Sequence, residues 1–395
     1  MPLKTLALYP EAAQNRTMRN KARTLSLGLC ALVLGATVAA LGQPVITSFS
    51  ANGVLACSNL APGSVAVVEW ASSMAGPWTN NWAGLEAVAV DANGKIQVSV
   101  PMFYRVRGTN SVPSGMALIP AGPFVMGDTF GEGYSDELPL HTNQISAFYL
   151  DQYEVTKALW DGVYNWATNH SYSFDYGAQG KATNHPAQSL TWYDAVKWCN
   201  ARSEQQGRTP AYYTDAAQTL VYRAGQANVQ NDWVKWRSGY RLPTEAEWER
   251  AARGGAGGQR FPWSSTNNIT HSMANYYSDA YYSYDTSFTR GNHPTFATGG
   301  YPYTSPAGYF AATGYGLYDM AGNVGEWCWD WYDGTYYTSS PGTDPRGPVS
   351  GPYRVIRGGG WDSDAYLCRA AYRSYCDPDY GDYYLGFRSA LPSGQ

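Results

Sequence analysis

Short apolar runs, each separated from the next by turn residues, mark the chain between residues 43 and 109. The four runs cover residues 64–70, 87–90, 96–100 and 103–106, and the turn pairs are Asn52-Gly53, Pro62-Gly63 and Asn93-Gly94. Valine-rich runs of this length between such turn signals are typical of antiparallel strands. The pattern predicts a small all-β, sandwich-like domain over residues 43–109. Nothing in this segment suggests catalytic chemistry. Residues 110–115 have the composition of a linker.

Helical periodicity is short and local in the rest of the chain. Trp192, Val196 and Cys199 recur at helical spacing, and Ser189 or Thr191 in front of them can cap a helix. These positions predict one short helix that begins near residue 192.

A second helix is indicated by a capping box at 244–247. Thr244 can accept from the backbone of Glu247, and the Glu247 side chain can reach back. Trp248 and Ala252 then share one face, and a glycine pair ends the helix at 254–255. Residues 255–392 show few long periodic segments, which predicts irregular loops around a small sheet.

The composition supports a fold rich in loops. The chain has 33 Tyr, 15 Trp and 42 Gly, and only 15% of its residues are charged. Buried rings with a polar tip can hold such loops in place. A helical bundle would need more Leu, Ala, Glu and Lys than this.

The first 42 residues have the pattern of a signal peptide. Arg16, Arg19 and Lys21 belong to a basic region, an apolar run covers 25–41, and residues 40–42 offer a small-x-small cleavage site. A single membrane anchor is the alternative, although the run is near the lower length limit for a span. We expect an exported protein (periplasmic, cell-surface or secreted) with no membrane span after cleavage.

Net charge and cysteine spacing argue against two kinds of function, nucleic-acid binding and zinc binding. Without residues 1–42 the chain carries 22 basic and 30 acidic residues, a balance of −8 that argues against nucleic acid as a partner. Its five cysteines leave at least one thiol free or paired between chains in an oxidising compartment. CxxC and HExxH spacings are absent from the sequence, so a zinc site has no support.

An ordered set of segments resembles the formylglycine-generating-enzyme (sulfatase-modifying-factor) family. The segments span about 275 residues and are 116–127 (MALIPAGPFVMG), 154–156 (EVT), 184–186 (NHP), 192–196 (WYDAV), 241–248 (RLPTEAEW), 261–263 (FPW), 316–327 (GLYDMAGNVGEW), 357–359 (RGG) and 385–388 (LGFR). The resemblance implies a C-type-lectin-like α+β fold over residues 114–392. Arg241 and Arg388, which lie in these segments, are expected to lock loops through bidentate pairs.

The resemblance also implies calcium. Carboxylate oxygens and backbone carbonyls at close spacing suit Ca²⁺. The alternative is a solvated turn with a purely structural role. The family's calcium loop matches Asp319, Gly322, Val324 and Glu326, and Gly325 replaces the Trp usual there. A second family site matches Asn275 and Tyr276, with Asp285 and Ser287 as its remaining ligands in a looser alignment.

The family's catalytic cysteine pair is incomplete. Members that oxidise a sulfatase cysteine carry two cysteines five apart, which bind copper(I), a metal that selects thiolates. An ungapped alignment from the glycines at 358–360 places Ser363 and Cys368 at these positions. A second alignment makes Cys368 structural, and Cys376 substitutes only if its loop folds back. Neither alignment supplies a pair, so copper is not expected and no residue is assigned as catalytic.

The other cysteines do not supply the missing member of the catalytic pair. Cys199 matches a position that is often disulfide-bonded in the family, but Ser389 stands where its partner is expected. Pairing of Cys328 with Cys368 stays open from the sequence. An iron-dependent sulfoxide synthase would need a histidine-rich helical domain, whereas the five histidines here are scattered.

The C-terminal segment has the composition of a paratope. Tyrosine offers contact area at low entropic cost, and Asp adds adaptable hydrogen bonds. The candidate ligand-binding residues are Trp361, Asp364, Tyr366, Tyr372, Tyr375, Asp377, Asp379, Tyr380, Asp382, Tyr383 and Tyr384. Variable proteins of diversity-generating retroelements look similar, and some use this family's fold. The structural alternative is that these tyrosines pack inside a loop-rich core and contact no ligand.

Two hypotheses of different class follow. The first is a noncatalytic binding protein for a protein or glycan ligand, with a retroelement-diversified variable protein as one form of it. The alternative is a copper-dependent oxidase that generates formylglycine on sulfatase cysteines.

Overall fold

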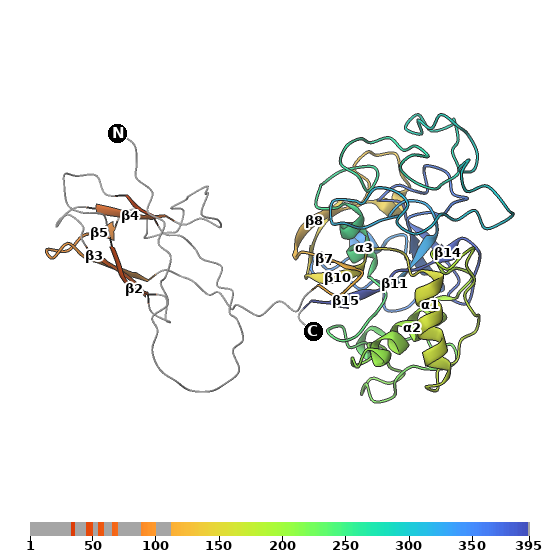
Figure 1. Ribbon diagram of the computed structural model, residues 1–395, viewed down its shortest axis with the longest axis horizontal. Coiled ribbons are helices and arrows are strands. Elements are labelled where there is room, and N and C mark those ends of the chain that lie inside the picture. The colour runs from red at the N-terminus through yellow and green to blue at the C-terminus, as the bar shows by residue number, and fades with distance from the viewer. Residues whose placement is uncertain are drawn as a thin grey trace. The chain divides into compact units, whose positions relative to one another are not determined.

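The computed structural model describes residues 112–393 and, before them, residues 33–35, 45–49, 54–58, 65–69 and 88–99. The chain divides into two compact units, residues 1–108 and 109–395 (Figure 1).

The described residues of the first unit form two antiparallel sheets of three strands. One has the order β2-β3-β6, formed by β2 (Val45–Phe49), β3 (Val54–Ser58) and β6 (Ile96–Ser99). The other has the order β1-β4-β5, formed by β1 (Val33–Gly35), β4 (Val65–Glu69) and β5 (Val88–Ala89). The runs at 64–70, 87–90 and 96–100 thus form strands, and the run at 103–106 lies outside the described residues. So does the expected signal peptide, apart from β1.

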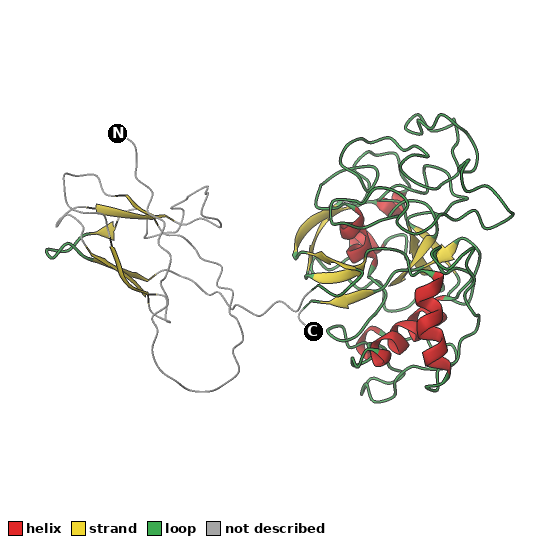
Figure 2. Ribbon diagram, in the orientation of Figure 1, coloured by secondary structure: helices red, strands yellow, loops and turns green. Residues whose placement is uncertain are grey.

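The second unit combines small sheets with long loops, as Figure 2 shows. Its sheets have the orders β15-β10-β7, β8-β9 and β13-β12-β11-β14. The strands are β7 (Met116–Ile119), β8 (Gly122–Met126), β9 (His141–Ile145), β10 (Phe148–Asp151), β11 (Gly325–Trp331), β12 (Arg354–Arg357), β13 (Ser374–Cys376), β14 (Leu385–Gly386) and β15 (Ala390–Pro392). Most pairs are antiparallel, whereas β11 and β14 run parallel. This mixture with few helices confirms the expected α+β class.

Within residues 112–393, three α-helices accompany the sheets, and three short 3-10 helices lie in the loops. The α-helices are α1 (Lys157–Thr168), α2 (Trp192–Gln205) and α3 (Glu245–Ala252). The 3-10 helices are η1 (Ser135–Glu137), η2 (Asn231–Trp233) and η3 (Tyr336–Thr338). Helix α1 packs on α2, and α3 packs against β8, β11 and β12. Among the described residues, no helix combines the length and the apolarity that crossing a bilayer requires.

Local capping explains where two of these helices begin. The Thr191 side chain accepts from the backbone of Asp194 at 3.0 Å, and the Thr244 side chain accepts from Glu247 at 3.2 Å. In each case the third helical residue bonds back, which completes a capping box. Both predicted helices are confirmed, and Gly254 follows the second with a positive φ.

Buried aromatic rings join the helices to the strands of the second unit. Trp160 of α1 and Trp198 of α2 stack with their ring centroids 5.9 Å apart, and Phe387 meets Trp198 edge-on at 5.2 Å. All three belong to one core cluster. A second cluster joins Trp248 of α3 to Phe148 and Leu150 of β10. Rings and caps together hold the loops that carry the candidate sites.

Bidentate arginines lock these loops, as the sequence predicted for Arg241 and Arg388. Arg241 donates to both carboxylate oxygens of Glu247 at 2.6 Å. Arg388 donates to both oxygens of Glu326 at 2.7 and 2.6 Å. Such charge-assisted pairs have fixed geometry and therefore define how the two segments meet.

Candidate functional site

A buried acidic centre lies where three loops meet. Glu154 precedes α1, Asp319 precedes β11 and Glu326 lies on β11, and all three side chains are buried. Glu154 accepts from the backbone of Val324 at 3.1 Å and from the Asn323 amide at 2.6 Å. The Glu154 carboxylate is thus held in place by the loop that carries Asn323 and Val324.

The acidic centre carries more negative charge than its one arginine balances. Burial, followed by the charges of Asp319 and Glu326, raises the pKa of Glu154 well above its usual value. Burial also raises the pKa of Asp319 to about 6. Arg388 pairs only with Glu326 by direct ion contact. Crowded carboxylates of this kind favour protonation or the binding of a cation.

The first expected calcium set is only partly available. Oδ2 of Asp319 accepts from the backbone of Gly308 at 2.6 Å, whereas its Oδ1 is buried without a hydrogen-bond partner. Both oxygens of Glu326 are engaged by Arg388, and Oε2 also accepts from the Trp248 indole at 2.8 Å. Asp319 therefore offers a free ligand oxygen, while Glu326 serves the ion pair.

The loops of the two expected calcium sites touch each other at Gly322. Asn323 donates from its backbone to the carbonyl of Asn275 at 2.8 Å. A Cβ at Gly322 would lie 2.2 Å from that carbonyl oxygen, and the φ of Gly322 is +78°, so only glycine fits here. The side-chain Oδ1 of Asn275 is also buried without a partner.

The second expected set is brought together but is occupied by internal hydrogen bonds. The Tyr276 carbonyl accepts from His271 Nε2 at 3.1 Å. Asp285 accepts from the Tyr276 hydroxyl at 2.6 Å and from the backbone of Ser287 at 3.1 Å. In the part of the chain that the structure describes, no group of three or more His, Cys, Asp or Glu side chains is placed to hold a metal ion. A cation here would depend on carbonyl and amide oxygens as well.

At the cysteine-pair positions the structure places one hydroxyl and one buried thiol. The Ser363 hydroxyl accepts from the backbone of Gly360 at 2.9 Å. Cys368 is fully buried in a cluster with Phe261, Tyr276 and Ala365. Burial, followed by the charges of nearby aspartates, raises the pKa of its thiol well above the usual value. A buried thiol of this kind is unreactive.

The cysteines of the described residues are all unpaired. Cys57, Cys199, Cys328, Cys368 and Cys376 are free thiols. Cys199, Cys328 and Cys368 lie in three different core clusters, because each packs as a small hydrophobe against its own neighbours. The Cys328–Cys368 bond that the sequence left open is therefore not formed.

The predicted ligand-binding residues fall into separate aromatic groups instead of one patch. In the first group Tyr301 stacks on Trp361 with ring centroids 5.3 Å apart, and Tyr383 lies 6.1 Å from Tyr301. Trp361 is only 2% exposed, while Tyr301 is 69% and Tyr383 is 41% exposed. The prediction that Trp361 offers contact surface is wrong, because Tyr301, Tyr303 and Tyr383 surround it.

A second group surrounds Tyr366. This ring stacks on Tyr282 at 5.7 Å and meets Tyr134 and Tyr372 edge-on, both at 5.4 Å. The Tyr282 hydroxyl donates to Asp364 at 3.3 Å. Tyr134, Tyr282 and Tyr301 were missed by the sequence analysis. Their only signal was the high tyrosine content of loops far from the C-terminus.

The remaining predicted residues form two smaller arrangements. Tyr375 stacks on Tyr332 with ring centroids 4.1 Å apart, and it is 48% exposed. The Tyr380 hydroxyl donates to Asp382 at 2.5 Å, and Tyr383 and Tyr384 meet edge-on. Asp377 and Asp379 are exposed. The segment thus presents several tyrosines to solvent, of which Tyr375 and Tyr383 are fixed by neighbouring rings and Tyr380 by its hydrogen bond.

The loop-rich α+β fold and its arginine-locked loops define a domain of the formylglycine-generating-enzyme type, with a C-type-lectin-like fold. A family model described as "Sulfatase-modifying factor enzyme 1-like domain" matches residues 104–392, and the chain belongs to this family. The formylglycine-generating enzyme of Streptomyces coelicolor is 35% identical over 298 residues, which is 70% of this chain and 88% of that protein.

Solved structures support the same fold. The structure of Treponema denticola variable protein 1 aligns with a TM-score of 0.53 and 29% identity, covering 73% of this chain and 99% of that one. PvdO from Pseudomonas aeruginosa aligns with a TM-score of 0.50 and 25% identity, covering 70% of this chain and 93% of that one.

Proposed function

We propose that this chain is an exported, noncatalytic ligand-binding member of the family, with a protein or glycan as its ligand. The observation that carries the proposal is the cysteine-pair region, where Ser363 supplies a hydroxyl and Cys368 a fully buried thiol. One thiolate does not provide the two-sulfur ligation that copper(I) prefers. The exposed Tyr375, Tyr380 and Tyr383 supply rigid contact area in its place.

The likeness to a variable protein supports a narrower form of this proposal, in which the C-terminal segment is diversified by a retroelement. The genomic locus tests it. We expect a near-copy of the C-terminal coding region that differs at adenines, together with a reverse transcriptase gene. A locus without both features refutes the retroelement form and leaves ligand binding standing.

A copper-dependent oxidase is the second candidate, and the names of relatives favour it. We expect the reduced, purified protein to show no tight copper(I) binding in competition with a chromophoric chelator. We also expect no aldehyde on a peptide that carries a sulfatase cysteine motif. The Streptomyces coelicolor relative serves as the positive control in both assays. Stoichiometric copper bound between two thiolates, or aldehyde formation above the Ser363→Ala/Cys368→Ala background, refutes the noncatalytic proposal.

Export is proposed from the basic and apolar pattern of residues 1–42. Sequencing the N-terminus of protein from the native host checks it. A mature chain that begins at Gln43 supports cleavage, and an intact Met1 in a cytoplasmic fraction contradicts it.

Calcium binding is proposed at the contact between the Asp319 and Asn275 loops. Two oxygens, Asp319 Oδ1 and Asn275 Oδ1, are buried in these loops without partners, and the carboxylates of Glu154 and Glu326 lie near Asp319. Hard oxygen ligands of this kind fit Ca²⁺. A bound ion would neutralise the carboxylates and tie the two loops together.

Adding calcium is expected to stabilise the protein. A ligand at 100 times its Kd adds about 2.7 kcal/mol to the free energy of unfolding. Thermal and urea denaturation in calcium and in excess chelator measure the increment. Asp319→Asn should lose most of it, while Asp161→Asn, which changes a half-exposed carboxylate of α1, should keep it. Equal stability in calcium and in chelator would disprove the site.

A further inference from the structure

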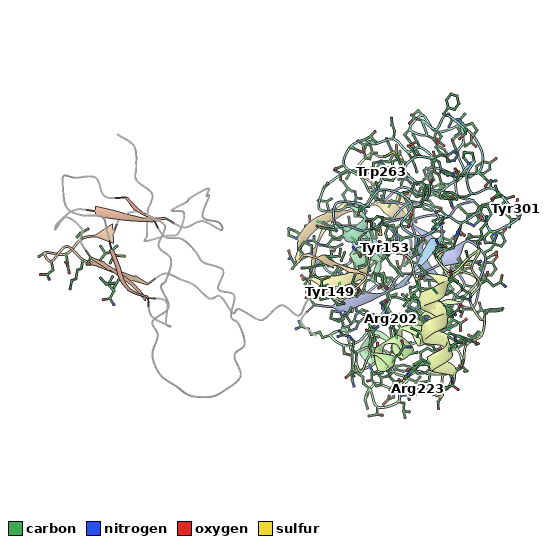
Figure 3. All side chains as sticks on the ribbon, in the orientation of Figure 1. Tyr149, Tyr153, Arg202, Arg223, Trp263 and Tyr301 are labelled. Atoms are coloured by element: carbon green, nitrogen blue, oxygen red, sulfur yellow. The ribbon has the colours of Figure 1, made fainter. Side chains whose placement is uncertain are left out.

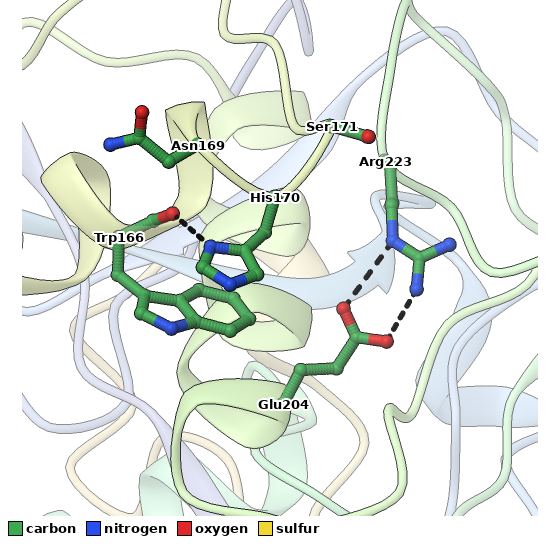
Figure 4. Close-up of a pocket in the computed structure, with 6 residues that line it drawn as sticks. All are labelled: Trp166, Asn169, His170, Ser171, Glu204 and Arg223. Atoms are coloured by element: carbon green, nitrogen blue, oxygen red, sulfur yellow. Dashed lines mark hydrogen bonds and ion pairs between the residues drawn. The ribbon is translucent and has the colours of Figure 1, made fainter.

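An open pocket lies beside the C-terminal ends of α1 and α2 in the second unit. It has a volume of about 550 Å³ and is lined by Trp166, Asn169, His170, Ser171, Glu204 and Arg223 (Figure 4). Figure 3 draws Arg223 and Tyr301 at separate edges of this unit, so the pocket is distinct from the aromatic group of Tyr301. From its geometry we propose that this pocket binds a neutral saccharide.

One side of the pocket is a flat aromatic platform. The His170 ring stacks on the Trp166 indole with ring centroids 3.8 Å apart and an interplanar angle of 10°. His170 Nδ1 donates to the Trp166 carbonyl at 2.7 Å, which fixes the ring and leaves Nε2 as an acceptor in the neutral imidazole. Such a platform can pack against the C–H face of a pyranose ring while its nitrogen meets a hydroxyl.

The other side supplies a donor and an acceptor next to each other. Arg223 pairs with Glu204 through Nε at 3.3 Å and through Nη2 at 2.5 Å. The hydroxyl of the buried Tyr172 donates to the same carboxylate at 2.7 Å and holds it in place. Both side chains keep exposed surface, 35% for Arg223 and 22% for Glu204. A guanidinium beside a carboxylate matches two adjacent hydroxyls, of which one accepts and one donates.

The charge of the pocket selects among ligand classes. The charges of Glu204 and Arg223 cancel. An anionic ligand would be repelled by the Glu204 carboxylate, and a cationic ligand by the Arg223 guanidinium. Asn169 donates its amide to the Asn165 carbonyl at 2.8 Å, which leaves its side-chain oxygen as a further neutral acceptor. A neutral molecule with many hydroxyls and one apolar ring face uses all of these groups. The volume lies within the range of small-ligand sites and suits one or two sugar rings.

Saturation-transfer NMR on the full chain tests the proposal. The probes are the methyl glycosides of glucose, galactose, mannose and N-acetylglucosamine at 10 mM, with glucuronate and glucosamine as charged probes. At least one neutral glycoside is expected to receive saturation at its ring protons. Trp166→Ala should weaken its binding at least tenfold, and Glu204→Gln should weaken it about fivefold, as expected for one lost hydrogen bond.

Two further variants distinguish a loss of ligand binding from a loss of folding. Trp166 also packs against the core, so His170→Ala, at an exposed position, provides a second disruption and should weaken binding about as much as Trp166→Ala. Tyr176→Ala removes a tyrosine that is 54% exposed and does not line the pocket, and it should leave binding unchanged. No transfer to any neutral glycoside, equal transfer in the folded His170→Ala variant, or tighter binding of a charged probe would overturn the proposal. These results do not depend on the copper and aldehyde assays.

Discussion

Arg388→Met is expected to lower the free energy of unfolding by about 3–5 kcal/mol, because removing one partner of a buried ion pair strands the other. Arg388 is fully buried and donates to both oxygens of Glu326. It also donates to the carbonyls of Asp151 at 3.2 Å and of Tyr318 at 3.0 Å. One side chain thus ties β10, β11 and the Asp319 loop together.

Urea denaturation of the variant beside the wild type measures this loss. Lys157→Met is the control, since it breaks the partly exposed pair with Asp161 and should cost at most about 1 kcal/mol. Arg388→Met/Glu326→Gln should recover part of the loss, because the stranded carboxylate is then neutral. A single variant within about 1 kcal/mol of the wild type would refute the role assigned to Arg388.

The second large effect is expected from two arginines on strand β12 that differ only in their partners. Arg357→Met should cost about 2–3 kcal/mol, because it removes charge-assisted hydrogen bonds to the buried Glu245 and Glu249. Each carboxylate keeps a second arginine, Arg373 for Glu245 and Arg253 for Glu249. Arg357 donates to these carboxylates at 3.1 and 2.5 Å and to the Ala370 carbonyl at 2.7 Å. Its side chain and both carboxylates are buried, so solvent cannot replace the lost contacts.

Arg354→Met is the matched control, and its cost should be at least about 1 kcal/mol smaller, because no carboxylate loses a hydrogen bond. Arg354 is fully buried, donates to the Trp329 carbonyl at 2.6 Å and lies against indole rings. Its guanidinium lies 3.6 Å from the Trp192 ring centroid and 3.4 Å from that of Trp331. Burial lowers the pKa of Arg354, whereas the charge of Glu249 raises that of Arg357 against its burial. Methionine keeps favourable contacts with the indoles. Equal losses in the two variants would show that burial, and not carboxylate pairing, sets the cost.

Interactions between residues close in sequence were the predictable part of the fold. Thr244 and Glu247 are three residues apart, so the capping box and the start of α3 follow from local geometry. Helix α1 was missed, although Thr156 caps it and Trp160, Val163 and Ala167 form its buried face. Its apolar positions resemble those of the surrounding aromatic-rich loops, and packing on α2 is what distinguishes them.

The candidate sites depended more on distant contacts. The sequence predicts Asp319 and Asn275 as calcium ligands but not the engagement of Glu326 by Arg388, 62 residues away. Trp361 was predicted to be a contact residue because its neighbours are tyrosine and aspartate. Tyr301, from a loop 60 residues earlier, stacks on it and helps to bury it.

The sequence by itself determined the family, the α+β class, two helix starts and the presence of a serine, Ser363, five residues before Cys368. Each of these follows from residue identity and order alone. Only the tertiary structure decided that the remaining thiols lie in separate clusters, that the tyrosines form several groups, and that a polar pocket opens beside α1 and α2. The physical reason is that burial and ion pairing depend on which distant segments pack together, and the order of residues along a loop does not specify that.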